Sequence, residues 1–191
     1  MTLPDLEQVE VTSQAALWAW LETHHSQDAS VLLVTWKKAA GETYVGRDAV
    51  LDALIAYGWI DGRRYKHEDA MRTIQLIAPR AQTVWAETYK QRAVKLEQEG
   101  RMQDAGRAAI AFAKSAGLWN AGKDVDALLV PDVLAEALEA KHARSKFDAM
   151  APSYRRNVLR WLNLAKQQKT QVARAEKIAE YSARGEKIPQ Y

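Results

Sequence analysis

Cysteine is absent from this chain of 191 residues, which excludes disulfide bonds, thiolate catalysis and metal sites built on thiolates. Long apolar runs are absent too, since no stretch approaches the roughly 18 residues of a membrane-spanning helix. The N-terminal segment carries Asp5, Glu7 and Glu10 and has no basic region followed by an apolar run, unlike a secretory signal. These features predict a soluble, cytoplasmic protein.

Motifs for metal binding, nucleophilic catalysis and phosphate binding are also missing. The four histidines include the adjacent pair His24 and His25, whose side chains would project about 100° apart on a helix. No histidine has a second one four residues on, and there is no Gly-x-Ser-x-Gly, Ser-x-x-Lys or glycine-rich phosphate loop. The sequence therefore predicts no metal and no cofactor, and it favours a protein that is not an enzyme. A carboxylate pair brought together by folding stays open.

Charge is distributed unevenly along the chain. Residues 141–191 hold 12 Lys and Arg against 4 Asp and Glu, a net charge of +8. Of the 27 basic and 24 acidic residues in total, residues 1–140 hold the remaining 15 and 20, a net charge of −5. This asymmetry predicts a basic C-terminal part.

The stretch 53–62, ALIAYGWIDG, joins a helix to a strand. A mostly apolar helix is expected over 47–57, and Gly58 stands where a left-handed C-cap belongs. Asp61-Gly62 is a turn dipeptide, and residues 73–78 alternate polar and apolar side chains. We therefore expect a hairpin that pairs 59–66 with 72–78.

The remaining elements follow from apolar periodicity, caps and glycine stops. A nearly all-apolar strand, buried on both faces, is expected over 31–37. An extended surface connection is expected over 118–129. The small residues Ala105, Gly106, Ala108 and Ala109 predict that a neighbouring element approaches closely. Helices are expected over 13–24 (capped by Ser13), 83–99 (capped by Thr83), 102–117, 131–141, 153–166 and 170–184.

Together these elements predict an α+β fold. A small antiparallel sheet packed with helices forms the core domain, 1–129, and a basic all-helical segment, 130–191, is expected to pack on that core.

The chain resembles the bacterial YdeI/OmpD-associated family, also called bacteriocin-protection proteins. The resemblance rests on positions spread from Trp18 to Gly185: Ala53-Leu54, Gly58-Trp59-Ile60-Asp61-Gly62, Pro79-Arg80, Trp85, Gly100-Arg101-Met102, Gly106, Phe147, Met150, Pro152-Ser153-Tyr154-Arg155-Arg156, Leu159-Arg160-Trp161, Ala165-Lys166 and Lys177. The segment 81–84 departs from the family pattern, which has a more basic stretch and Ser-Asn there. Position 56 is alanine where a cysteine is frequent. If those positions shape a ligand site, the site differs in this chain.

The resemblance implies a compact α+β part with a helical C-terminal part and no established enzymatic activity. We therefore expect a non-catalytic binding or interaction protein, with a role in bacterial stress or bacteriocin protection suggested by the family's name. Its partner is an unidentified protein or small molecule.

Two groups of residues are candidates for binding. The first, which suits a small polar ligand, is Trp59, Asp61, Arg63, Arg80 and Trp85. The alternative is binding of nucleic acid through basic helices, by Arg155, Arg156, Arg160, Lys166 and Arg174. In both cases a purely structural role is the alternative to binding. In the first group, Trp59 would be a core residue and Asp61 a turn residue. In the second group, the basic residues would form the solvent-exposed face of their helices.

Overall fold

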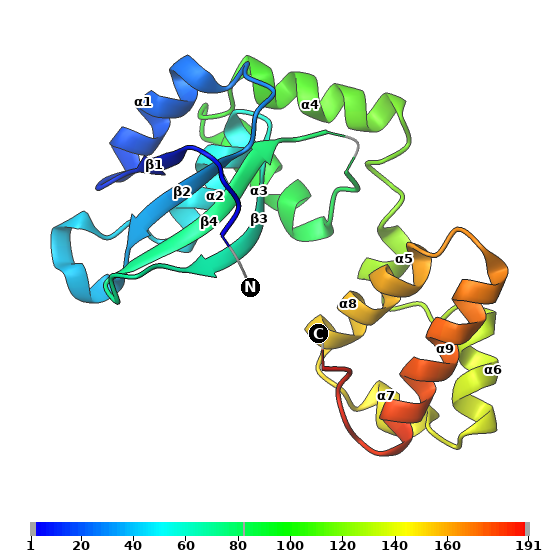
Figure 1. Cartoon of the computed structure of the whole chain (residues 1–191). Helices are drawn as coiled ribbons and strands as arrows, with labels where there is room; N and C mark the ends of the chain where they lie inside the picture. Colours follow the sequence, from blue (N-terminus) through cyan, green and yellow to red (C-terminus); the bar gives the residue numbers. More distant parts are fainter. Residues whose placement is uncertain (1–2, 82, 190–191) are drawn as a thin grey trace. The chain divides into compact units, whose positions relative to one another are not determined.

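The computed structural model describes residues 3–81 and 83–189. The chain forms two compact units, residues 1–121 and 122–191, and each is described by itself (Figure 1). Elements of the first unit are β1 (Gln8–Glu10), α1 (Gln14–His24), β2 (Val31–Trp36), the 3₁₀ helix η1 (Lys38–Thr43), α2 (Arg47–Ala56), β3 (Trp59–Lys66), β4 (Arg72–Pro79), α3 (Glu87–Gln98) and α4 (Asp104–Ser115). The second unit contains α5 (Lys123–Asp126), α6 (Asp132–Ala140), α7 (Arg144–Asp148), α8 (Pro152–Asn163) and α9 (Gln168–Ala183). The predicted α+β class is confirmed.

The strands of the first unit form one mixed sheet in the order β1-β2-β4-β3. Strands β2 and β3 both pair antiparallel with β4, so the predicted hairpin of 59–66 with 72–78 is confirmed. Strand β1, which the sequence did not predict, pairs parallel with β2. A register shift between Asp61 and Arg64 marks a β-bulge in β3, where the turn dipeptide had been expected.

Both faces of β2 are buried, as its apolar run predicted. Val31 and Leu33 belong to the main core, which also contains residues of α1, α2, α3 and α4. Leu32 and Val34 point the other way and form a second cluster with Ile74 of β4. We call the side of the sheet that carries Val31 and Leu33 the helix-covered face, because α1 and α2 pack there (Figure 1).

Two glycines allow close packing around α2. Gly58 has a φ of 73°, the left-handed conformation predicted for it, and a Cβ there would lie 2.9 Å from the carbonyl oxygen of Ala105. A Cβ at Gly106 would lie 2.3 Å from the carbonyl oxygen of Ala56 and 2.8 Å from that of Ile55. The predicted close approach at Gly106 is therefore confirmed, and the neighbour is α2.

Two predicted features were wrong in detail. The helix expected from Thr83 begins at Glu87, with Ala86 as N-cap, and the Thr83 hydroxyl accepts a hydrogen bond from Arg80 instead. The stretch 83–86 stays non-helical because the backbone N–H of Trp85 donates to Leu118 while its indole enters the core. The expected extended connection, 118–129, contains α5, whose Val125 is buried in the apolar core of the second unit.

The second unit has its own apolar core. Helix α8 contributes Tyr154, Val158, Leu159 and Leu162, at the spacing of one helical face. Phe147 of α7 is fully buried among them, although α7 itself was not predicted. The predicted domain boundary at 129/130, and the packing of the second part on the first, stay predictions.

Candidate functional site

Three of the five residues predicted for a small polar ligand gather on the helix-covered face of the sheet. Asp61 of β3 and Arg80 just after β4 both contact Tyr89 of α3, and Trp85 before α3 contacts Arg80. We call these four residues the Arg80 cluster. They fasten the start of α3 to the sheet.

Arg80 lies between two aromatic rings. Its guanidinium carbon is 4.0 Å from the centre of the Trp85 ring and 5.1 Å from that of Tyr89. Nη1 donates to the Thr83 hydroxyl at 3.2 Å, and the buried Nε has no acceptor among the described residues. Burial lowers the pKa of Arg80 to about 10, against the opposing effects of Tyr89 and Asp61, so the guanidinium keeps its charge at neutral pH.

Asp61 uses both carboxylate oxygens within the protein. The Tyr89 hydroxyl donates to Oδ1, and the Gln75 amide of β4 donates to Oδ2 at 3.1 Å. Burial, followed by the hydrogen bond to Asp61, raises the pKa of Tyr89 to about 12. The carboxylate therefore holds a protonated tyrosine in place.

Trp59 belongs to the core of the first unit. Trp59 is fully buried, donates from Nε1 to the His25 carbonyl at 3.0 Å and packs edge-on against Trp20 at 5.5 Å. Arg63 lies exposed in the β-bulge. Trp85 is also fully buried, so a surface ligand could reach neither indole without displacing other side chains. Ligand binding at the five predicted residues stays a prediction.

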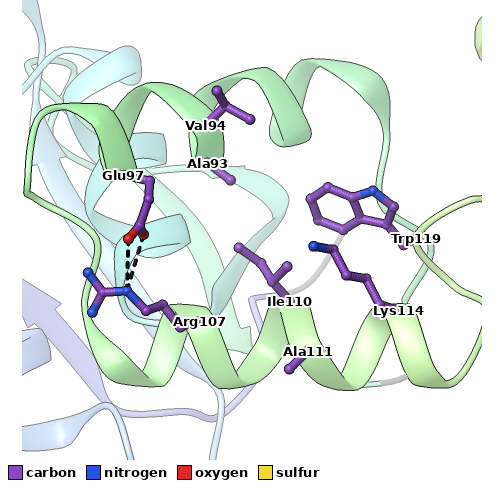
Figure 2. Close-up of a pocket in the computed structure, with 8 residues that line it drawn as sticks. All are labelled: Ala93, Val94, Glu97, Arg107, Ile110, Ala111, Lys114 and Trp119. Atoms are coloured by element: carbon purple, nitrogen blue, oxygen red, sulfur yellow. Dashed lines mark hydrogen bonds and ion pairs between the residues drawn. The ribbon is translucent and has the colours of Figure 1, made fainter.

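A hollow of about 380 Å³ opens between α3 and α4 (Figure 2). We call it the α3–α4 groove. The groove adjoins the Arg80 cluster, because the ring of Trp119, which lines the groove, lies 5.1 Å from the ring of Trp85, which belongs to the cluster. Its lining comprises Ala93, Val94, Glu97, Arg107, Ile110, Ala111, Lys114 and Trp119.

The two ends of the α3–α4 groove differ in charge. At one end, Arg107 donates from Nε to both carboxylate oxygens of Glu97, at 3.1 and 3.2 Å, and from Nη1 to Asp104 at 2.9 Å. At the other end, the ammonium groups of Lys114 and Lys90 lie 5.3 and 5.6 Å from the centre of the Trp119 ring. The groove is therefore apolar along its length, acidic at the first end and basic at the second.

The sequence did not single out this groove. The segment 118–129 had been interpreted as a surface connection, but it contains Trp119, and a tryptophan with no predicted element around it is costly to expose. This cost of exposing Trp119 was the signal in the sequence that could have pointed to the groove. The distance between Trp119 and α3 along the chain hid their contact.

The basic residues of the second unit make contacts within that unit. Arg155 pairs with Asp148 at 2.7 Å, and Arg160 approaches Asp126 at 3.4 Å. Arg174 donates to the Trp161 carbonyl, and Arg156 approaches that of Asp126 at 3.5 Å. Lys166 is exposed. Four of the five side chains thus support the helical unit, and binding of nucleic acid through them stays a prediction.

Metal sites and membrane spans are both absent from the part of the chain that the structure describes. Among residues 3–81 and 83–189, no three His, Asp or Glu side chains are grouped so that they could hold a metal ion. No helix in those same residues is long and apolar enough to cross a membrane.

Two family models match different parts of the chain. Residues 9–109 match a domain of unknown function, DUF8412, and residues 127–185 match the family described as bacteriocin-protection, YdeI or OmpD-associated. No curated protein and no solved structure matches the chain significantly. The resemblance inferred from the sequence is confirmed for residues 127–185, whereas most of the first unit matches the other domain. The chain therefore belongs to the DUF8412 family, whose model matches just over half of its length, and its residues 127–185 are similar to the YdeI/OmpD-associated family.

Proposed function

We propose that this chain is a non-catalytic binding protein and that the α3–α4 groove is its binding surface. One observation carries the proposal. The groove is an apolar hollow of about 380 Å³, within the usual size range of small-molecule sites, and it ends in charged groups that could orient a ligand.

The polar residues of the Arg80 cluster, beside the groove, are occupied within the protein. Asp61 binds Tyr89 and Gln75, and Arg80 stacks between Trp85 and Tyr89. These groups have the chemistry of a binding site, but they are used to hold α3 against the sheet. Trp119 and Lys114 face the open hollow instead (Figure 2).

The proposed setting follows the family description of the second unit. We propose that binding by the first unit serves protection against bacteriocins or another stress, in the cytoplasm of a bacterium.

A ligand screen with two matched variants tests the groove. A metabolite library is screened for compounds that raise the unfolding temperature, because a ligand that binds the folded state stabilises it by mass action. Val94 lines the groove with a side chain that is 54% exposed, so Val94→Glu places a charge in the hollow without disturbing the core. Leu164→Glu makes a similar change at a 74% exposed position of the second unit.

We expect compounds whose effect is lost in Val94→Glu and kept in Leu164→Glu. Binding that is equally strong in both variants would contradict the groove as the binding surface. A product that the wild type forms from a library compound, and that folded Asp61→Asn does not form, would contradict the non-catalytic part of the proposal.

Nucleic-acid binding by the second unit is a second candidate function. It is favoured by the excess of 12 basic over 4 acidic residues in 141–191 and by the exposed side chains of Lys166 and Lys169. Affinity for DNA and RNA would fall steeply with salt and would decrease in a Lys166→Glu, Lys169→Glu variant. A flat salt response would exclude this candidate.

A further inference from the structure

We propose that the ligand of the α3–α4 groove is a small amphiphilic carboxylate, with an aliphatic or aromatic body and one anionic end. This inference rests on the proposed function and names the chemistry of its ligand. The apolar body would lie along α4, and the carboxylate would lie beside Trp119.

The groove wall selects an apolar body. Ala93 and Val94 line it from α3, and Ile110 and Ala111 line it from α4 (Figure 2). Val94 is more than half exposed, so apolar area remains for a ligand to cover. A fully polar ligand would gain little from these side chains.

The basic end of the groove selects an anion. Lys90 pairs with Glu87 at 3.4 Å, whereas no carboxylate among the described residues forms an ion pair with Lys114. The ammonium group of Lys114 is therefore available to a carboxylate at the mouth of the groove. At the opposite end, the guanidinium of Arg107 is already paired with the carboxylates of Glu97 and Asp104, so it is not available to an anion bound in the reverse direction.

A cationic ligand is disfavoured at the same place. An aromatic ring such as that of Trp119 could attract a cation, but two ammonium groups already lie within about 6 Å of its centre. A third cation would be repelled by both. The charge pattern thus distinguishes carboxylates from amines that have the same apolar body.

The Trp119 wall is held in position before any ligand arrives. Its backbone N–H donates to the Ala113 carbonyl at 3.0 Å, and its ring packs on Trp85, which is backed by Arg80 at 4.0 Å. A rigid wall lowers the entropy cost of binding. The Arg80 cluster therefore has a positioning role for the groove.

Titration calorimetry with three probes of the same chain length tests the inference: decanoate, decanol and decylamine. Lys114→Met removes the charge and keeps the length of the side chain. Lys169→Met makes the same change at an exposed lysine of the second unit. Unfolding temperatures of both variants verify that they are folded.

We expect decanoate to bind the wild type about tenfold or more tightly than decanol, the effect of one charge-assisted contact, and decylamine to bind least. Lys114→Met should weaken decanoate to the level of decanol and leave decanol unchanged. Lys169→Met should change neither affinity.

Other outcomes separate the ligand class from the site. Equal affinities for decanoate and decanol, both reduced by Val94→Glu, would overturn the carboxylate and keep the groove as a binding surface. Decanoate binding that Val94→Glu leaves unchanged would contradict the groove itself. If none of the three probes binds, the proposal that the ligand is an amphiphilic carboxylate is wrong. The library screen would still decide whether the groove is a binding surface.

Discussion

At the scale of single residues, the absence of a side chain at position 106 determines how closely α4 approaches α2. Carbonyl oxygens of Ala56 and Ile55 occupy the space that a Cβ would need, and both belong to the backbone. They cannot move without shifting α2. Helix α4 also forms one wall of the α3–α4 groove, so this contact supports the candidate site.

We expect Gly106→Ala to lower the free energy of unfolding by about 3 kcal/mol, because overpacking outweighs the roughly 1 kcal/mol by which alanine favours a helix. Chemical denaturation measures the change. Gly117→Ala is the control: its φ of 73° is strained for alanine but its surroundings are open, so about 1 kcal/mol is expected. Equal losses in the two variants would contradict the contact.

Tyr89 gives the first unit a dependence on alkaline pH. Its pKa is about 12 in the folded protein against an ordinary value of 10. The folded state therefore holds the proton more tightly, and this stabilisation is complete below pH 10 and lost as the pH rises to 12. Arg80, whose pKa is lowered, changes stability in the opposite direction over the same range.

Comparison of the wild type with Tyr89→Phe isolates the tyrosine. Between about pH 9 and about pH 11.5, we expect the wild type to lose about 1 kcal/mol more stability than Tyr89→Phe, with allowance for partial exposure of the hydroxyl. Denaturant midpoints at the two pH values measure the difference. Parallel losses would mean that Tyr89 titrates normally.

At the scale of elements, α8 shows how a basic helix can serve packing. Its apolar face carries Tyr154 and Leu159, and the hydroxyl of Tyr154 accepts a hydrogen bond from the backbone of Ile188 at 3.1 Å. On its flank, Arg155 lies against Phe147 and pairs with Asp148, with only 14% of its side chain exposed. The positive charge thus joins α8 to α7.

We expect Arg155→Met to destabilise the second unit by about 1–2 kcal/mol, because the substitution keeps the apolar stem and removes a well-shielded ion pair. Lys166→Met, at an exposed lysine, should change stability by less than about 0.5 kcal/mol. Denaturation monitored by hydrogen exchange of α8 measures both. A negligible effect of Arg155→Met would favour the predicted role of Arg155 in binding nucleic acid.

At the scale of the whole molecule, the residues that the structure describes form two separate large cores. The cluster around Trp59 and Trp85 draws only on residues of the first unit, and the cluster around Phe147 only on the second. A loss of packing in one cluster should therefore destabilise the unit to which it belongs.

The chain has two phenylalanines, which form a matched pair for this test. Phe147 is fully buried, so Phe147→Ala should cost about 3–5 kcal/mol. Phe112 of α4 is 47% exposed, and Phe112→Ala should cost little. Hydrogen exchange should show a loss of protection for Phe147→Ala confined to 122–191. Loss in both units would support the predicted packing of the C-terminal segment on the core.

Much of the fold could be predicted because the relevant signals are local. The apolar run of β2, the glycine after α2 and the alternating strand β4 each determine their own structure. The misses have a common cause. Thr83 has the sequence features of a helix cap, but a contact with Leu118, distant along the chain, holds the segment extended.

The candidate site was predicted only in part for the same reason. Asp61, Arg80 and Trp85 were expected together, but Tyr89 of α3, which contacts both Asp61 and Arg80, was not among the predicted residues. The groove beside them needs Trp119 to return to α3 and α4. No local pattern encodes that return.

The sequence by itself determined the absence of thiol chemistry, the α+β class and most of the elements, because composition and periodicity act over a few residues. Tertiary structure alone decided which polar groups are used up in packing and which face an open hollow. Burial and partners depend on residues far apart along the chain, and for this reason Lys114 and Trp119 become candidates for binding while Trp59 is fully buried in the core.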